Sequence, residues 1–278
     1  MKRFEKKVAI VTGSSNGIGR ATAVLFAQEG AKVTITGRNS QRIEETKQEI
    51  LKAGVPEAHV NIVVGDITST YVQEELIQST VDKFGRIDIL VNNAGGAILD
   101  NMGSLGVNQS LDNFDETLNL NMKSVIGMTQ KAIPHLEKTK GDIVNVSSIA
   151  SGPRSVPDFN NYSLSKAALD QYTRNSAINL IEKGIRVNSV NPGVVVTGAS
   201  EALGLPKEIS EKYLNVLRNS KHCVPARFVA EPEQIAQAIA FLADRNMSSY
   251  IIGHQLVIDG GTTLVTGMNA TNFPELLK

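Results

Sequence analysis

The sequence has little cysteine, no excess of charge of either sign and no long apolar run. Cys223 is the only cysteine among 278 residues, so an internal disulfide is excluded, which suits a reducing compartment. The 28 basic and 28 acidic residues cancel, and no basic cluster is long enough to indicate a nucleic-acid-binding or membrane-surface protein. No apolar stretch approaches the ~20 residues that span a membrane.

Histidine is also scarce. The four histidines are scattered, and none has a partner at metal-ligand spacing, so we expect no metal site. The first seven residues lead directly into an apolar run at Val8, which predicts no signal or transit peptide. A cytoplasmic protein that binds neither nucleic acid nor membranes is the resulting expectation.

Short apolar runs alternate with longer segments of helical period. The runs are apolar at successive positions, as in strands buried on both faces of a parallel sheet; they are 8–11, 33–36, 62–64, 87–91, 143–146, 187–190 and 255–258. The helical segments are 18–29, 41–53, 71–84, 112–138, 162–183, 208–218 and 232–243. The alternation predicts an α/β fold: a doubly wound, mostly parallel seven-stranded sheet with helices on both faces, Rossmann-like.

The chain shows no internal repeat and no linker, so we expect a single dinucleotide-binding and catalytic domain over residues 1–278. Two stretches, 95–110 and 193–227, interrupt the alternation. Long loops in compact domains often bind ligands, and we expect these two to form the substrate walls, with the substrate loop at about 193–227.

A glycine-rich turn follows the first predicted strand and opens the first helix. Its spacing is Gly-x-x-x-Gly-x-Gly. Glycines let the backbone approach a phosphate, and the N-terminus of a helix favours the anion. The turn therefore predicts the pyrophosphate site of a dinucleotide cofactor, formed by Gly13, Ser15, Asn16, Gly17, Ile18 and Gly19.

Three further strand ends complete the predicted cofactor groove. The second strand ends without an acid for the ribose 2′-hydroxyl, and Arg38 can pair with a 2′-phosphate. NADP(H) is therefore favoured over NAD(H), which remains possible. After the third strand, Asp66 and Ile67 are expected at the adenine; after the fourth, the adenosine ribose is expected to meet Asn92, Ala94 and Gly95.

Tyr162 and Lys166 are four residues apart within a predicted helix. Residues at this spacing share one face. A nearby ammonium stabilises a phenolate, which lowers the pKa of the tyrosine. The pair predicts a proton donor and acceptor usable near neutral pH.

Taken in order along the chain, these motifs resemble the short-chain dehydrogenases/reductases over about residues 6–265. The motifs are Thr12–Gly19, Asp66, Asn92–Gly95, Asn121, Ser147–Ser148, Tyr162 with Lys166, Asn191–Gly193 with Thr197, and Asp259–Gly261. Within the family the chain is similar to tropinone-reductase-like members and to uncharacterised nematode reductases.

The resemblance implies four catalytic residues. Tyr162 would exchange a proton with the substrate oxygen, and Lys166 would lower the pKa of Tyr162 and bond the nicotinamide ribose; both are also expected to contact the cofactor. Ser148 would hold the substrate oxygen, with Ser147 as the alternative, and Asn121 would help to hold a water that links Lys166 to solvent. The nicotinamide would be placed by Pro192, Gly193, Val195 and Thr197.

Two positions depart from the family pattern. Ser148 lies 14 residues before Tyr162, one more than is common, and Asn16 stands where NADP-specific relatives often carry a basic residue. We expect an NADP(H)-dependent carbonyl reductase that moves hydride between the nicotinamide and a neutral ketone or secondary alcohol. The alternatives are a β-ketoacyl-thioester reductase and a non-catalytic NADP-binding sensor; enoyl reduction is disfavoured by the short Tyr-to-Lys spacing. A homotetramer or homodimer is expected.

Overall fold

The computed structural model describes residues 2–153, 156–198 and 206–265, so part of the predicted substrate loop, residues 199–205, lies outside the described residues. The described chain forms one sheet of seven strands in the order β3-β2-β1-β4-β5-β6-β7, and every neighbouring pair is parallel. The strands are β1 Val8–Val11, β2 Lys32–Gly37, β3 Val60–Val64, β4 Ile89–Asn92, β5 Asp142–Val146, β6 Arg186–Pro192 and β7 Gln255–Ile258. The predicted fold class is confirmed.

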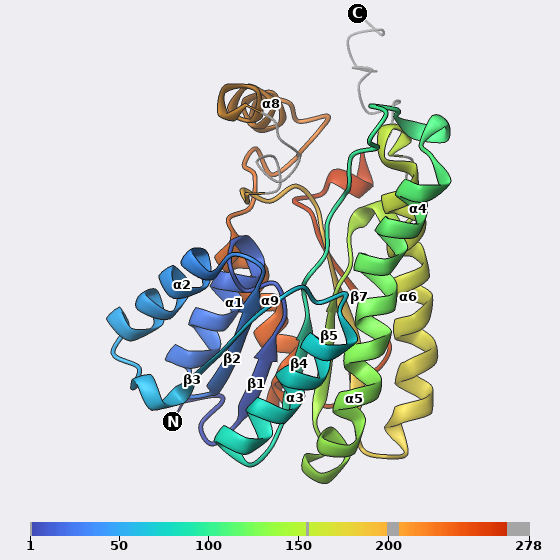
Figure 1. Ribbon diagram of the computed structural model, residues 1–278. Coiled ribbons are helices and arrows are strands. Elements are labelled where there is room, and N and C mark those ends of the chain that lie inside the picture. Colours follow the sequence, from blue (N-terminus) through green and yellow to red (C-terminus); the bar gives the residue numbers. More distant parts are fainter. Residues whose placement is uncertain (1, 154–155, 199–205, 266–278) are drawn as a thin grey trace, which may run out of the picture.

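Helices cover both faces of the sheet (Figure 1). One face packs against α1 Gly17–Gln28, α2 Ser40–Lys52 and α9 Pro232–Ala243; the other packs against α3 Thr70–Phe84, α5 Ser124–Thr139 and α6 Asn160–Ile181. The remaining helices of the described residues are α4 Leu111–Leu118, α8 Lys207–Asn219 and α10 Arg245–Ser248. No helix of the described ranges is long and apolar enough to cross a membrane.

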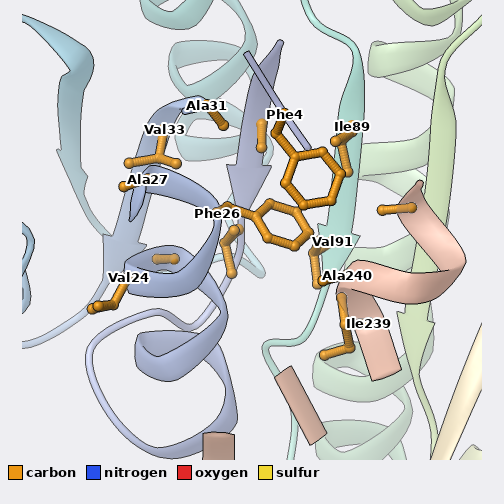
Figure 2. Close-up of a cluster of buried hydrophobic side chains, with 14 of the residues drawn as sticks. Phe4, Val24, Phe26, Ala27, Ala31, Val33, Ile89, Val91, Ile239 and Ala240 are labelled. Carbon is orange, nitrogen blue, oxygen red and sulfur yellow. The ribbon is translucent and has the colours of Figure 1, made fainter. Parts of the chain in front are cut away.

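The core on the α1 side is built around two aromatic rings. Phe4 and Phe26 lie with their centroids 4.6 Å apart and their planes tilted by 40°. Figure 2 shows the rings beside Ile89 and Val91 of β4, and Ile239 and Ala240 of α9 belong to the same cluster. This packing fixes the N-terminal segment and α1 against the sheet. It therefore also fixes the helix that the glycine-rich turn opens.

Four helices end just before a glycine. Gly30, Gly54, Gly85 and Gly184 have positive φ angles of 98°, 82°, 80° and 77°, the left-handed conformation that glycine adopts without strain. One helical prediction differs from the structure. The expected single helix over 112–138 is divided by a π-helical turn, η3 Asn119–Lys123, between α4 and α5.

The strand order reverses between β1 and β4, which follow one another in space but not in sequence. At such a point the connections leave in opposite directions, and ligands of open α/β sheets bind beyond the carboxyl ends of the strands there. The glycine-rich turn follows β1 and the segment from Asn93 follows β4, so both leave this edge. In Figure 1, α8 lies beyond the same edge.

Candidate active site

The glycine-rich turn fits tightly against the end of β4. Gly13 has a φ of +64° and Gly17 one of +51°. A Cβ at Gly13 would lie 2.8 Å from Ala94 Cα, and a Cβ at Gly19 would overlap the Gly13 carbonyl oxygen. Three of the predicted glycines are therefore required by the shape of the turn itself, which leaves the backbone N–H groups at the start of α1 open to a ligand.

The turn is fixed by three side chains within the predicted motifs, to which the sequence assigned no such structural role. Thr12 Oγ1 accepts from the backbone N–H groups of Asn93 and Ala94 at 2.9 and 3.0 Å. Asn93 Nδ2 donates to Thr12 O at 2.8 Å. Ser14 Oγ accepts from Thr36 N at 2.8 Å, which ties the turn to β2. The signal for them was their position beside glycines at two adjacent strand ends.

The loop after β6 comes over the glycine-rich turn. A Cβ at Gly17 would lie 3.0 Å from Thr197 Cγ2. Asn16 caps α1, and its Oδ1 accepts from Gly17 N at 2.7 Å. A cavity of about 310 Å³ lies between the two segments, with Asn16, Gly17 and Thr197 in its wall. The predicted residues of the turn and of the nicotinamide loop thus lie together, and the turn fits a pyrophosphate.

Arg38 and Asp66 are both exposed and follow neighbouring strands, because Gly37 pairs with Val64. Burial opposes ionisation of Asp66, but hydrogen bonds from Thr68 and the charge of Arg38 outweigh it and lower the pKa of the carboxyl. Arg38 therefore presents a guanidinium at the edge of the groove, where a 2′-phosphate would compete with Asp66 for it.

Two of the predicted cofactor residues, Ile67 and Asn92, have buried side chains. Ile67 is 8% exposed and belongs to the core cluster under α3. Asn92 is 2% exposed, and its Nδ2 donates to Asn145 Oδ1 at 2.9 Å and to Thr129 Oγ1 at 3.3 Å. Their side chains therefore belong to the interior, and the expected contacts of these two residues with the adenosine stay a prediction.

Tyr162 and Lys166 lie on α6 and meet Ser148 from the loop after β5. The half-buried Tyr162 hydroxyl is hydrogen-bonded to Ser148. Lys166 is 3% exposed, its Nζ donates to Val146 O at 2.8 Å, and it lies 5.7 Å from the centre of the Tyr162 ring. The structure thus brings three of the four predicted catalytic side chains together.

The protonation of this group differs from the sequence-based expectation. Burial raises the pKa of Tyr162 above its usual range, although the bond to Ser148 acts in the opposite direction. Burial lowers the pKa of Lys166 to about 8, against the attraction of Asp170. The expected lowering of the Tyr162 pKa is absent, because desolvation is the largest influence on the phenol. Tyr162 is therefore a proton donor in this state.

Asn121 lies in the π-helical turn, where the wider backbone turns its side chain inward. It is fully buried; Oδ1 accepts from Gly96 N at 2.9 Å, and Nδ2 donates to Gly96 O at 2.9 Å and to Ser165 Oγ at 3.0 Å. Short π-helical turns frequently occur at functional sites. Both ends of the amide are bound to protein, and the predicted water contact of Asn121 stays a prediction.

Gly95 must lack a side chain for this arrangement. A Cβ there would lie 2.7 Å from Asn121 Oδ1 and 3.3 Å from Lys166 Nζ. Ser147 is 4% exposed, and its Oγ is 3.4 Å from Lys166 O. Ser148 Oγ instead meets Tyr162 and accepts from Ala150 N at 3.1 Å. The geometry favours Ser148 over Ser147.

The nicotinamide loop starts from the end of β6. Pro192 is its last strand residue, and a Cβ at Gly193 would lie 2.9 Å from Asp259 Cα. Val195 forms an isolated bridge with Ala230. The loop is therefore fixed by contacts with Asp259 and Ala230 before it reaches Thr197. No group of histidine, cysteine or acidic residues among the described positions could hold a metal ion.

Comparisons with known proteins agree with this geometry. A family model described as enoyl-(acyl carrier protein) reductase matches residues 13–263. The dehydrogenase/reductase SDR family member 4 of Caenorhabditis elegans is 35% identical over 94% of this chain and 96% of that protein. The chain belongs to the short-chain dehydrogenase/reductase family. It is an NAD(P)-dependent oxidoreductase.

Solved structures extend the likeness. A short-chain dehydrogenase/reductase of unknown function from Caenorhabditis elegans, crystallised with cofactor, is 56% identical, with a TM-score of 0.96 and coverage of 97% of this chain and 100% of that chain. Apo glucose dehydrogenase of the same organism is 57% identical, with a TM-score of 0.81 and coverage of 95% and 100%. The expected similarity to nematode reductases is confirmed; the tropinone-reductase-like placement stays a prediction.

Proposed function

We propose that this protein transfers hydride between NADP(H) and a neutral ketone or secondary alcohol, with Tyr162 as the general acid and base. One observation carries the proposal: the Tyr162 hydroxyl is hydrogen-bonded to Ser148, beside the buried ammonium of Lys166. This group sits at the carboxyl edge of the sheet, next to a turn shaped for a dinucleotide. One domain holds both parts.

The residues of the chain handle the proton and the developing charge. The bound nicotinamide would supply the hydride in reduction and accept it in oxidation. As negative charge grows on the substrate oxygen, Ser148 and Tyr162 stabilise it by donating hydrogen bonds. Tyr162 then gives its proton to that oxygen, a step that contributes ~10²–10⁴-fold. The cation of Lys166 stabilises the phenolate that remains.

Residues 13–19 would hold the pyrophosphate, and the loop from Pro192 to Thr197 would hold the nicotinamide. The preference for NADP(H) rests on Arg38, which is exposed at the end of β2, and this strand end itself carries no acidic residue. The similarity to a structure that contains a cofactor supports binding of a dinucleotide but not the choice between the two.

The variant Tyr162→Phe tests the assignment. We expect it to lose at least ~10²-fold in kcat while NADPH still binds, as measured by fluorescence titration. Tyr172→Phe is a matched control: Tyr172 is also half-buried on α6, but its hydroxyl is bonded to Ser176 and Thr129. Substantial turnover by Tyr162→Phe, or an equal loss in both variants, would reject the mechanism.

Two relatives suggest other substrates. Glucose dehydrogenase of Caenorhabditis elegans is 57% identical, which favours oxidation of a sugar hydroxyl as a second candidate. The 3-oxoacyl-[acyl-carrier-protein] reductase of Thermotoga maritima is 36% identical over 94% of this chain and 100% of that protein, which keeps β-ketoacyl-thioester reduction as a third. A panel of ketones, secondary alcohols, glucose and a β-ketoacyl thioester, assayed with NADPH or NADP⁺, separates them. If no compound in the panel is turned over and NADPH still binds tightly, a non-catalytic NADP-binding sensor is favoured.

The assembly and the compartment complete the proposal. α6 exposes Leu164 and Ile178, 50% and 71% accessible respectively, and α5 and α6 together carry more apolar residues than one buried face requires. We expect a homotetramer or homodimer built through these helices in the cytoplasm. Light scattering after size-exclusion chromatography measures the mass of the assembly; a monomer would contradict it.

A further inference from the structure

We propose that Asp170 is a positioning residue that holds Ser148 within reach of Tyr162. Asp170 lies on α6, one helical turn after Lys166 and two turns after Tyr162. It has no expected contact with substrate or cofactor. The inference rests on the proposed function, because it concerns the serine that would hold the substrate oxygen.

The carboxylate of Asp170 is buried, 7% exposed, and binds two neighbours through one oxygen. Oδ2 accepts from Ser151 Oγ at 2.6 Å and from Asn191 Nδ2 at 2.8 Å. Ser151 belongs to the short helical turn that follows Ser148, and Asn191 lies in β6. One carboxylate therefore joins the helix of Tyr162 to two neighbouring segments.

Both partners of Asp170 also bind the main chain of Ser148. Ser151 Oγ shares its single proton between Asp170 Oδ2 and Ser148 O, each 2.6 Å away, and Asn191 Nδ2 donates to the same carbonyl oxygen at 3.2 Å. Asn191 Nδ2 further reaches Ser151 Oγ at 2.9 Å, while Asn191 Oδ1 accepts from Ser189 Oγ at 2.9 Å. The carbonyl of Ser148 is thus held by two side chains that Asp170 orients.

The network complements two other links between this loop and α6. Lys166 Nζ donates to Val146 O, and Ser147 Oγ lies 3.4 Å from Lys166 O. Together these bonds attach residues 146–151 to the helix on both sides of Ser148. Ser148, whose side chain is hydrogen-bonded to Tyr162, lies between these two sets of bonds.

The carboxylate of Asp170 attracts the ammonium of Lys166, but it also carries a cost for folding. Asp170 Oδ1 is buried and has no hydrogen-bond partner, and a buried polar atom without a partner is destabilising. A carboxylate with this energetic cost needs a function that offsets it. Alignment of Ser148 supplies one, because a displacement of ~1 Å in an active site can reduce turnover by ~10²-fold.

The test compares two variants of Asp170. Asp170→Ala removes the oxygen that Ser151 and Asn191 share, and we expect kcat to fall by ~10–10²-fold with the Kd for NADPH unchanged. Asp170→Asn keeps an accepting oxygen of the same reach, so we expect it to retain kcat within about fivefold of wild type. Asp244→Ala is a control, since Asp244 is a buried aspartate that caps α10; it should lower Tm without changing kcat.

A double-mutant cycle shows whether Asp170 acts through Ser148. If it does, Asp170→Ala costs less than about threefold in a Ser148→Ala background, because contacting residues couple and independent ones add. Retention of wild-type kcat by Asp170→Ala, equal losses in both Asp170 variants, or full additivity in the cycle would each overturn the inference. Unchanged turnover in Ser148→Ala would reject the role of Ser148 itself, and with it this inference. An active Tyr162→Phe would instead reject the proposed function.

Discussion

Replacing Lys166 with methionine should abolish turnover and make the folded protein more stable at pH 7. The ammonium is 3% exposed, and burial lowers the pKa of Lys166 from 10.5 to about 8. At ~1.4 kcal/mol per pKa unit, the buried charge costs the native state about 3 kcal/mol. Methionine removes this cost but leaves Val146 O without its 2.8 Å donor, a loss of ~1–2 kcal/mol. The net gain is about 1–2 kcal/mol, which should raise Tm by ~2–6 °C.

The gain should depend on pH in a defined direction. Below pH 8, Lys166 is protonated in the folded and the unfolded chain, so the wild type bears the full cost. Between pH 8 and 10.5 the unfolded chain still holds the proton that the folded protein has released. Stability from this group therefore rises with pH there, and the wild type approaches the variant. The raised pKa of Tyr162 acts in the opposite direction near pH 10, but Tyr162 is present in both proteins, so its effect cancels in the difference between them.

Calorimetric Tm values of both proteins at pH 7, 8, 9 and 10 measure the difference. Lys47→Met is the matched control, since the bond to Glu57 raises the pKa of Lys47; this variant should gain no stability, and its difference from wild type should be flat from pH 7 to 9. A Lys166→Met protein less stable than wild type at pH 7, or one whose advantage does not shrink with pH, would refute the reasoning.

Two further predictions concern the cofactor. Arg38→Ala should raise the KM for NADPH far more than that for NADH, because only NADPH carries the 2′-phosphate; equal effects in steady-state assays would reject this role. Gly19→Ala should weaken nucleotide binding at least ~10-fold in fluorescence titration, since its methyl would overlap the Gly13 carbonyl. Gly54→Ala, which meets no atom within 4 Å, should leave binding intact, and an unaffected Gly19→Ala would contradict the shape argument.

The strands and the glycine-rich turn were predictable because their signals are local. Buried parallel strands are apolar at successive positions, so seven such runs were enough to count the strands and order them along the chain. The turn needs glycine for the close approach of Gly13 to Ala94, and that requirement is visible in the spacing. The four helix ends at glycine follow from the same conformational freedom.

The π-helical turn and the burial of the Ile67 and Asn92 side chains were not predictable in this way. The helical period runs through residues 112–138 without interruption, and the turn coincides with the bonds that Asn121 makes to Gly96 and Ser165. Asn92 and Asn93 are identical neighbours. The side chain of Asn92 turns to β5, and Asn93 fixes the glycine-rich turn. Only the packing of the sheet distinguishes them.

By itself, the sequence determined the fold class, the position of the dinucleotide turn and the pairing of Tyr162 with Lys166 on one helix. Each depends on residues close together in the chain. The protonation of that pair was decided only in the folded protein, because burial, which raises the pKa of Tyr162 and lowers that of Lys166, depends on segments distant in sequence. The contact of Ser148 with Tyr162 and the bonds of Asp170 to Ser151 and Asn191 were decided there for the same reason.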